Sequence, residues 1–132
     1  MKFSSKAEYG LMAMTNLAKA YPVQKNLKTI SAEEGISMKY LEQLATILRR
    51  KNLIISTKGK QGGYVLAKKP NRLTVGEIVE VLDGPIAPMK CVGKFCVKAA
   101  TCSSNVVWEK VSMQIKKTLY AMKLNQIIKN YE

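Results

Sequence analysis

Apolar residues recur every three or four positions at the start of the chain, which is typical of an amphipathic helix. The pattern predicts a helix over about 5–21, with Ser5 and Glu8 forming a capping box and Pro22 ending it. The positions expected to face the core are Ala7, Leu11, Met14, Ala18 and Tyr21. One face of this first helix is therefore predicted to be buried.

Two further helices are predicted directly after it. A short one covers 29–34 and is closed by Gly35, since glycine readily adopts the left-handed conformation of a helix end. Ser37 can cap the next helix through its side-chain oxygen. The buried stripe of that helix is formed by Leu41, Leu44 and Leu48. Helix, glycine-containing turn and helix in this order predict a helix-turn-helix.

A β-hairpin is predicted next. The β-branched and apolar runs 53–57 and 64–67 flank the glycine-rich segment 58–63, so the hairpin forms a wing beside the preceding helix. A fourth helix over 74–82 follows, with capping-box spacing between Thr74 and Glu77. Its apolar positions are Val75, Ile78, Val79 and Leu82. The fold class is thus mainly α with a small β-hairpin, a winged helix-turn-helix over residues 1–83.

The rest of the chain combines a loop with a long helix. Residues 84–103 show no helical or strand pattern and are predicted to be a loop. Over about 104–122, roughly 28 Å of helix, an apolar stripe is formed by Trp108, Val111, Ile115, Leu119 and Met122. A short helix over 124–131 follows. Because the long helix projects from a small domain, we expect a homodimer in which 104–132 supply the dimerisation and C-terminal helices; packing within the chain is the alternative.

The distribution of charge along the chain indicates a negatively charged binding partner. The 132 residues include 22 Lys and Arg against 9 Asp and Glu, a net charge of +13. No acid lies between Glu42 and Glu77, and the basic residues in that interval are Arg49, Arg50, Lys51, Lys58, Lys60, Lys68, Lys69 and Arg72. This clustering favours double-stranded DNA as the partner over an ordinary solvated surface or a membrane. Without a long apolar segment or leader pattern, we expect a cytoplasmic protein.

The residues expected to touch DNA lie on the second helix of the helix-turn-helix and on the wing. The B-form major groove admits one α-helix, whose first residues meet base edges. The candidates there are Ser37, Lys39, Glu42 and Gln43. Basic and polar candidates for phosphates or a groove are Arg49, Arg50, Lys51, Lys58, Lys60 and Gln61. Any exposed helical face carries such residues, so these candidates depend on the wing beside them.

All three cysteines fall in the predicted loop. Four residues separate Cys91 from Cys96 and five separate Cys96 from Cys102, so three thiolates can converge on one centre. Lys90, Lys94 and Lys98 surround them, and positive charge favours the thiolate form. The long spacings disfavour zinc, and the odd count disfavours a stable disulfide. Redox-active or incidental thiols remain an alternative.

The sequence resembles the IscR/NsrR/CymR family of winged-helix repressors over essentially its whole length. The matching segments are SSKAEYGL (4–11), YLEQ (40–43), LRRKNL (48–53), GGYVL (62–66), TVGEI (74–78) and LDGPI (82–86). The resemblance implies a homodimer with crossing C-terminal helices and two winged helices that read a near-palindromic operator. In part of this family the cysteine loop holds an iron-sulfur cluster, which is therefore the expected cofactor, 2Fe-2S in preference to 4Fe-4S.

The fourth ligand of such a cluster departs from part of the family. The chain has no histidine, and Asn105 stands where the family's histidine ligand would fall. Family members with a carboxylate ligand take it from the first helix of the opposite subunit, and the matching residue is Glu8. Asp83 and Glu109 are nearer in sequence and remain alternatives. Glu8 also has a structural explanation as part of the capping box beginning at Ser5.

The sequence therefore predicts a homodimeric, sequence-specific transcription regulator, expected to act as a repressor and controlled by an iron-sulfur cluster. A small iron-sulfur redox protein would account for the cysteines but not for the wing. A general nucleoid-binding protein would account for the charge but not for the cysteines. No nucleophile triad, phosphate-binding loop or dinucleotide fingerprint points to an enzyme.

Overall fold

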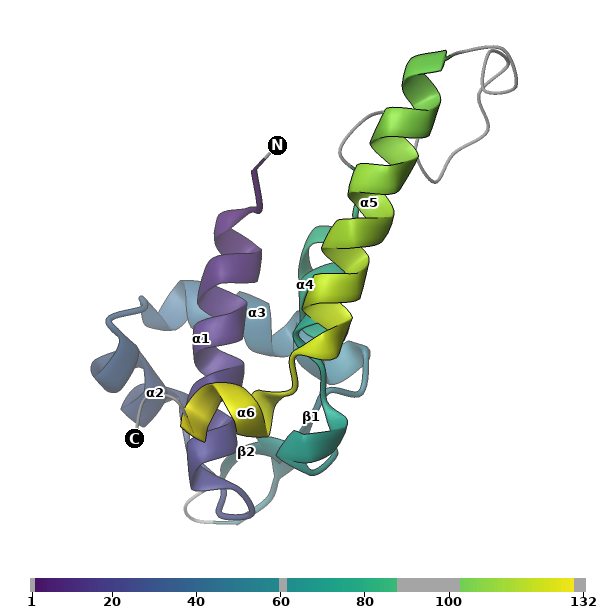
Figure 1. Cartoon of the computed structure of the whole chain (residues 1–132). Helices are drawn as coiled ribbons and strands as arrows, with labels where there is room; N and C mark the ends of the chain where they lie inside the picture. The colour runs from purple at the N-terminus through teal and green to yellow at the C-terminus, as the bar shows by residue number, and fades with distance from the viewer. Residues whose placement is uncertain (1, 60–61, 88–102, 130–132) are drawn as a thin grey trace.

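A computed structural model describes residues 2–59, 62–87 and 103–129 of the chain (Figure 1). Within these residues there are six α-helices, one short 3-10 helix and one antiparallel hairpin. In chain order they are α1 (Ser5–Ala20), α2 (Leu27–Glu34), α3 (Met38–Arg50), β1 (Ile54–Thr57), β2 (Gly63–Leu66), η1 (Pro70–Arg72), α4 (Val75–Asp83), α5 (Ser103–Ala121) and α6 (Leu124–Lys129). The predicted mainly α winged helix-turn-helix is confirmed, with η1 as the element that the sequence pattern missed.

A single apolar core joins α1 to the helix-turn-helix, the wing and the C-terminal helix. Its fully buried side chains are Met14, Ile30, Leu41, Leu44, Leu48, Leu73, Ile78 and Leu124. The stripe predicted for α3 and the four apolar positions predicted for α4 are all buried. Burying one such side chain is worth about 1.5–3 kcal/mol, so this shared core fixes how the elements lie relative to one another.

Local capping fixes several helix ends as predicted. Gly35 ends α2 with φ of 69°, in the left-handed region. The Ser37 hydroxyl accepts a hydrogen bond from the Tyr40 N–H at 3.3 Å and begins α3. At α4, Glu77 N–H donates to Thr74 Oγ1 at 3.1 Å and Thr74 N–H donates to Glu77 Oε2 at 3.2 Å, a complete capping box.

The predicted capping box of the first helix is wrong. The N-cap of α1 is Ser4, whose Oγ accepts from the Ala7 N–H at 3.2 Å. Ser5 is therefore already helical, and Glu8 lies one position beyond the residue that could complete a box with Ser4. Ser4 also donates from its N–H and hydroxyl to Asp83 at the end of α4, and this tertiary contact selects Ser4 over Ser5.

The wing is tied to the segment between α1 and α2 as well as to itself. β1 and β2 pair antiparallel, with Ile54 opposite Leu66 and Thr57 opposite Gly63. Tyr64 N–H donates to the Lys25 carbonyl at 2.8 Å, and Lys25 N–H donates to the Tyr64 carbonyl at 3.0 Å. A Cβ on Gly63 would lie 2.4 Å from the Lys25 carbonyl oxygen, so only glycine permits this close approach.

The long helix α5 is anchored at its C-terminal end and projects away from the body at the other (Figure 1). At the anchored end, the Leu124 N–H donates to the Leu73 carbonyl at 3.0 Å, and α6 packs beside α1. The Tyr120 ring covers Gly76 of α4 so closely that an added Cβ would lie 2.2 Å from it. This burial, together with the Glu80 carboxylate, raises the pKa of Tyr120.

Most of the apolar side chains of α5 have no cover within the described chain. No member of the predicted stripe from Trp108 to Met122 is buried, and the buried residues of α5 are Asn105 and Ser112. Val106, Val107 and Met113 are 54%, 51% and 69% exposed. Across the described ranges, no helix is long and apolar enough to cross a membrane.

A buried amide joins α1, α2 and the base of the wing. Asn16 is 6% exposed; its amide Nδ2 donates to Glu33 Oε1 at 3.3 Å and to Glu34 Oε1 at 3.0 Å. Lys25 Nζ donates to Asn16 Oδ1 and forms an ion pair with Glu33. The hydrogen bonds from Lys25 and Asn16 lower the pKa of Glu33.

This lowered pKa gives a pH prediction. A carboxyl group whose pKa is lower in the folded state contributes stability that is present above its unfolded pKa and is lost as the pH falls through the folded value. We expect the free energy of unfolding to fall between about pH 6 and about pH 3, and the Glu33→Gln variant to lose less over that range. Urea unfolding measures both, with Glu42→Gln, on an exposed residue of α3, as the control. Identical pH profiles for wild type and Glu33→Gln would contradict the prediction.

Candidate DNA-binding surface and cluster site

The exposed side of α3 carries the residues predicted to read DNA. Because Leu41, Leu44, Ala45 and Leu48 turn to the core, the opposite face of the helix is left to solvent. All four predicted base-reading residues, Ser37, Lys39, Glu42 and Gln43, are exposed on it or at its N-cap. Glutamine can pair with adenine, glutamate can accept from the cytosine amino group and lysine favours guanine. The face is chemically able to discriminate bases.

The basic end of α3 leads directly into the wing. Arg49, Arg50 and Lys51 are exposed, where cations also interact favourably with the C-terminal end of the helix dipole. Asn52 then adopts a φ of 60°, and the Leu53 N–H returns to the Leu48 carbonyl at 2.9 Å. This tight turn starts β1 within a few residues of the helix. The basic run and the wing are therefore consecutive parts of one surface.

The wing itself is described only in part. Lys58 is exposed at the end of β1. Lys60 and Gln61, also predicted to contact DNA, lie outside the described residues. Leu48 of α3 shares one apolar core with Ile54 and Leu66 of the wing, so this core holds the helix and the wing side by side.

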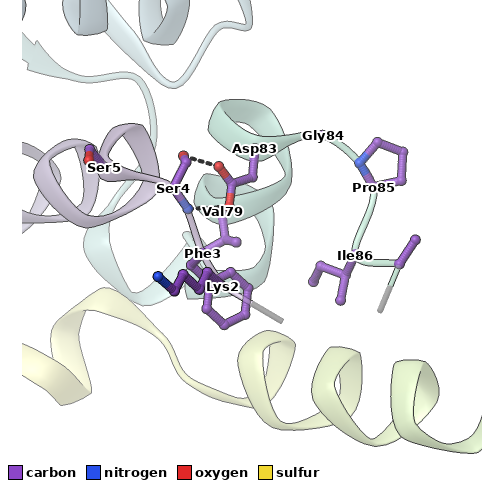
Figure 2. A pocket seen from close by; sticks show the side chains of 10 residues that line it. Lys2, Phe3, Ser4, Ser5, Val79, Asp83, Gly84, Pro85 and Ile86 are labelled. Atoms are coloured by element: carbon purple, nitrogen blue, oxygen red, sulfur yellow. Dashed lines mark hydrogen bonds between the residues drawn. The ribbon is translucent and has the colours of Figure 1, made fainter. Parts of the chain in front are cut away.

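The cysteines predicted to bind a cluster, Cys91, Cys96 and Cys102, also lie outside the described residues. The description stops at Ala87, four residues after the end of α4, and resumes at Ser103, where α5 begins, so only the two ends of the predicted cysteine loop are described. A cavity of about 490 Å³ lies at the beginning of the loop, between the N-terminal segment and the end of α4 (Figure 2). It is lined by Lys2, Phe3, Ser4, Ser5, Val79, Asp83, Gly84, Pro85, Ile86 and Ala87.

The three carboxylates considered as a fourth ligand lie in different environments. Both oxygens of Asp83 accept hydrogen bonds from Ser4, as the dashed lines in Figure 2 show. Glu109 is exposed on α5. Glu8 is exposed in the first turn of α1, and its side chain has neither a hydrogen bond nor an ion pair with any described residue. Glu8 therefore does not cap its helix, although a carboxylate in the first turn still interacts favourably with the helix dipole.

Asn105 is a residue whose environment the sequence did not predict. It lies in the first turn of α5, three residues after Cys102, and is 7% exposed. Its Oδ1 is buried without a hydrogen-bond partner. A buried polar atom left without a partner costs about 1–3 kcal/mol, so this oxygen is expected to pair with a group outside the described residues, such as a water molecule or the segment that precedes α5.

Comparison with known proteins assigns this architecture to a family. Residues 3–130 match the Rrf2 family, described as an iron-dependent transcriptional regulator. The chain belongs to the Rrf2 family. It is 34% identical to the HTH-type transcriptional regulator IscR of Xenorhabdus nematophila, over 100% of this chain and 82% of that protein. IscR of Escherichia coli K12 is 34% identical, over 100% of this chain and 83% of the relative.

Solved structures give the same assignment for this Rrf2 regulator. CymR of B. subtilis, described as the global cysteine regulator of that organism, superposes with a TM-score of 0.83 at 34% identity, over 98% of each chain. IscR of T. potens superposes with a TM-score of 0.79 at 38% identity, over 100% of this chain and 89% of the other. The predicted family, the DNA-binding regulatory function and the absence of an enzymatic role are confirmed.

The division of α3 and the wing into base and phosphate contacts is testable. Lys58→Ala should weaken DNA binding and reduce the salt dependence of log affinity by about one unit of slope, because one fewer counterion is released. Gln43→Ala should instead change the preference among operator variants, as expected of a base contact. Fluorescence anisotropy over a salt series measures both.

The matched control is Lys129→Ala, which removes an equal charge from α6. An unchanged affinity and slope in Lys58→Ala would remove the wing from the interface. Equal loss on all sequences in Gln43→Ala would exclude a base-reading role for that residue.

Proposed function

We propose that this Rrf2 regulator is a homodimeric repressor whose DNA binding is controlled by an iron-sulfur cluster held by Cys91, Cys96 and Cys102. The observation that carries the cluster is the set of three thiols in one lysine-rich loop, between the helix-turn-helix unit and α5. Two further observations support it: the family is described as iron-dependent, and three of the relatives reported above are named IscR. The proposal divides the chain into a DNA-binding domain (1–83), a cysteine loop (84–103) and a dimerisation and C-terminal segment (104–132).

The dimer is supported by the surface of α5. A helix that exposes Val106, Val107 and Met113 by more than half leaves apolar area in water at a cost of about 25 cal/mol per Å². A second α5 would cover it, and two reading helices would then lie on one duplex. For DNA contact we propose Ser37, Lys39, Glu42 and Gln43 at base edges, and Arg49, Arg50, Lys51, Lys58, Lys60 and Gln61 at phosphates or a groove.

The residues present fit a cluster that needs one ligand beyond its cysteines. Two oxygen-bearing groups of the described residues could supply it: the Oδ1 of Asn105, which is buried without a hydrogen-bond partner, and the exposed carboxylate of Glu8. We propose Glu8 of the partner subunit as the fourth ligand, and a 2Fe-2S cluster. When bound, the cluster would supply a redox-active centre with one labile, oxygen-ligated position, since carboxylate is a hard ligand beside soft thiolates.

Control of DNA binding follows from linkage. A bound group shifts a conformational equilibrium only by its differential affinity for the two states. The loop begins at the end of α4 and ends at α5, so a change in the loop can alter the geometry of the dimer helices relative to the wings. DNA affinity would then report cluster state.

A cluster-independent regulator is the second candidate, favoured by the similarity to CymR, the structure with the higher TM-score of the two described. In that case the three thiols would respond to oxidation directly or serve no regulatory role. Iron and sulfide analysis of anaerobically purified protein separates the two candidates. Iron and sulfide in the wild type that disappear in Cys91→Ala, Cys96→Ala and Cys102→Ala support the cluster; a wild type without either contradicts it.

The ligand role of Glu8 has its own test. Glu8→Ala should give a more labile or spectrally altered cluster, and mixing it with Cys91→Ala chains should restore one normal site per heterodimer. Complementation requires that the ligands come from different subunits. Visible absorption and circular dichroism under anaerobic conditions measure it.

The control is Glu109→Gln, an exposed carboxylate of α5. A wild-type spectrum and lifetime in Glu8→Ala would exclude Glu8. An altered spectrum in Asn105→Ala instead would assign the position to the amide within the same chain.

A further inference from the structure

The last residue of α4 and the segment that follows it are hydrogen-bonded to the start of α1 and to α5. On one side, the Ser4 N–H donates to Asp83 Oδ2 at 3.0 Å and the Ser4 hydroxyl donates to Asp83 Oδ1 (Figure 2). On the other side, the Ser112 hydroxyl of α5 donates to the Ile86 carbonyl at 2.9 Å. The two contacts lie three residues apart in the chain. Together they hold the start of the loop between α1 and α5.

The contact at α5 is shielded from water. Ser112 is 3% exposed and Ile86 is 4% exposed. A buried hydroxyl without a partner would cost about 1–3 kcal/mol, so the Ser112 bond to the loop is expected to persist. Ser112 and Asn105 are the buried residues of α5, seven positions or two helical turns apart. Both therefore lie on the side of α5 that faces its own chain.

The contact at α1 combines two roles in one side chain. The Ser4 Oγ accepts from the Ala7 N–H and so begins α1, while it donates to Asp83. Displacing Asp83 would therefore disturb the first turn of α1, the turn that contains Glu8. Farther along α1, Ala13, Met14 and Leu17 share one core with Leu41 and Leu44 of the reading helix.

Gly84 forms a turn between the two contacts. Gly84 has a φ of +87°, a conformation that side-chain-bearing residues rarely adopt, and nothing lies within 4 Å of the position of an added Cβ. The segment from Asp83 to Ile86 thus combines a glycine turn with a fixed point on either side. A change at Asp83 or Ile86 would therefore act on a contact with α1 or with α5.

We propose that Ser4, Asp83 and Ser112 are positioning residues that couple the cysteine loop to α1 and α5, so that the state of the loop reaches the reading helix and the dimer helix together. The proposal rests on the proposed cluster control and assigns its route. In this role Asp83 acts through its hydrogen bonds with Ser4 and not as a cluster ligand. Removing either contact should leave the cluster bound. The DNA affinity should then no longer depend on whether the cluster is present.

The test compares DNA affinity of cluster-loaded and cluster-free protein, with duplexes selected by the wild type. A coupling of at least about fivefold is expected for the wild type. Ser4→Ala, Asp83→Asn and Ser112→Ala should keep the visible spectrum of the loaded protein and bring this ratio to within about twofold of 1. Ser5→Ala and Thr118→Ala are the controls: Ser5 is exposed beside Ser4, and Thr118 bonds only within α5, to the Gln114 carbonyl. Both should keep the wild-type ratio.

Hydrogen–deuterium exchange of the wild type tests the route without a substitution. Cluster loading should slow exchange in peptides covering residues 4–8 and 110–114. Unchanged exchange in both segments, or a wild-type ratio in all three variants, overturns the proposal. Loss of the visible spectrum in Asp83→Asn but not in Ser4→Ala overturns it too, since Asp83 would then be a ligand. A wild type that binds no iron removes the proposed function itself, and the coupling with it.

Discussion

Burial of one face of α1 is the constraint on which the rest of this structure depends. Met14, Leu17 and Ala18 lie in the same core as the helix-turn-helix, the root of the wing and Leu124 of α6. Segments from both ends of the chain therefore share one interior, and α3 is held by its leucines with its polar face outward. The base-reading chemistry follows from this orientation, because a helix that turns its apolar side inward must present the other side to a groove.

The same constraint leaves two parts of the molecule incomplete. α5 is anchored to the core at its C-terminal end, by Tyr120 against Gly76 and by the backbone at Leu124, while most of its apolar side chains stay exposed. Near its N-terminal end, Asn105 keeps a buried oxygen without a partner. The dimer that we propose would cover the exposed side chains of α5. The cluster that we propose would lie next to Asn105 in the sequence, because Cys102 is three residues before it.

Local sequence signals predicted the elements well where the deciding interactions are themselves local. The leucine spacing of α3, the Thr74–Glu77 box and Gly35 each act within a few residues, and each was confirmed. The start of α1 was predicted correctly but its N-cap was predicted one residue late, because the capping-box spacing of Ser5 and Glu8 favoured Ser5. Asp83, 79 positions away, selects Ser4. The burial of Ser112 likewise depends on Ile86, which no periodicity reveals.

In the candidate site, too, the predictions that depend on local burial were confirmed, and those that depend on distant residues remain predictions. The predicted exposure of Ser37, Lys39, Glu42 and Gln43 is confirmed because burial of the opposite face dictates it, whereas their roles in base contact remain predictions. The ligand role of Glu8 also remains a prediction, and its competing role as a cap is excluded by the geometry of Ser4. Cofactor chemistry depends on atoms brought together by loops and by a second subunit, and for these residue spacing alone is a weak guide.

The central claim, that cluster state controls sequence-specific DNA binding by a dimer, is tested most directly by selecting duplexes from a random library with cluster-loaded and cluster-free protein at one salt concentration. The account predicts a near-palindromic motif, bound by a dimer, with affinity that differs at least about fivefold between the two forms. Equal affinity of the two forms for the same motif, or enrichment of no motif by either form, would contradict it.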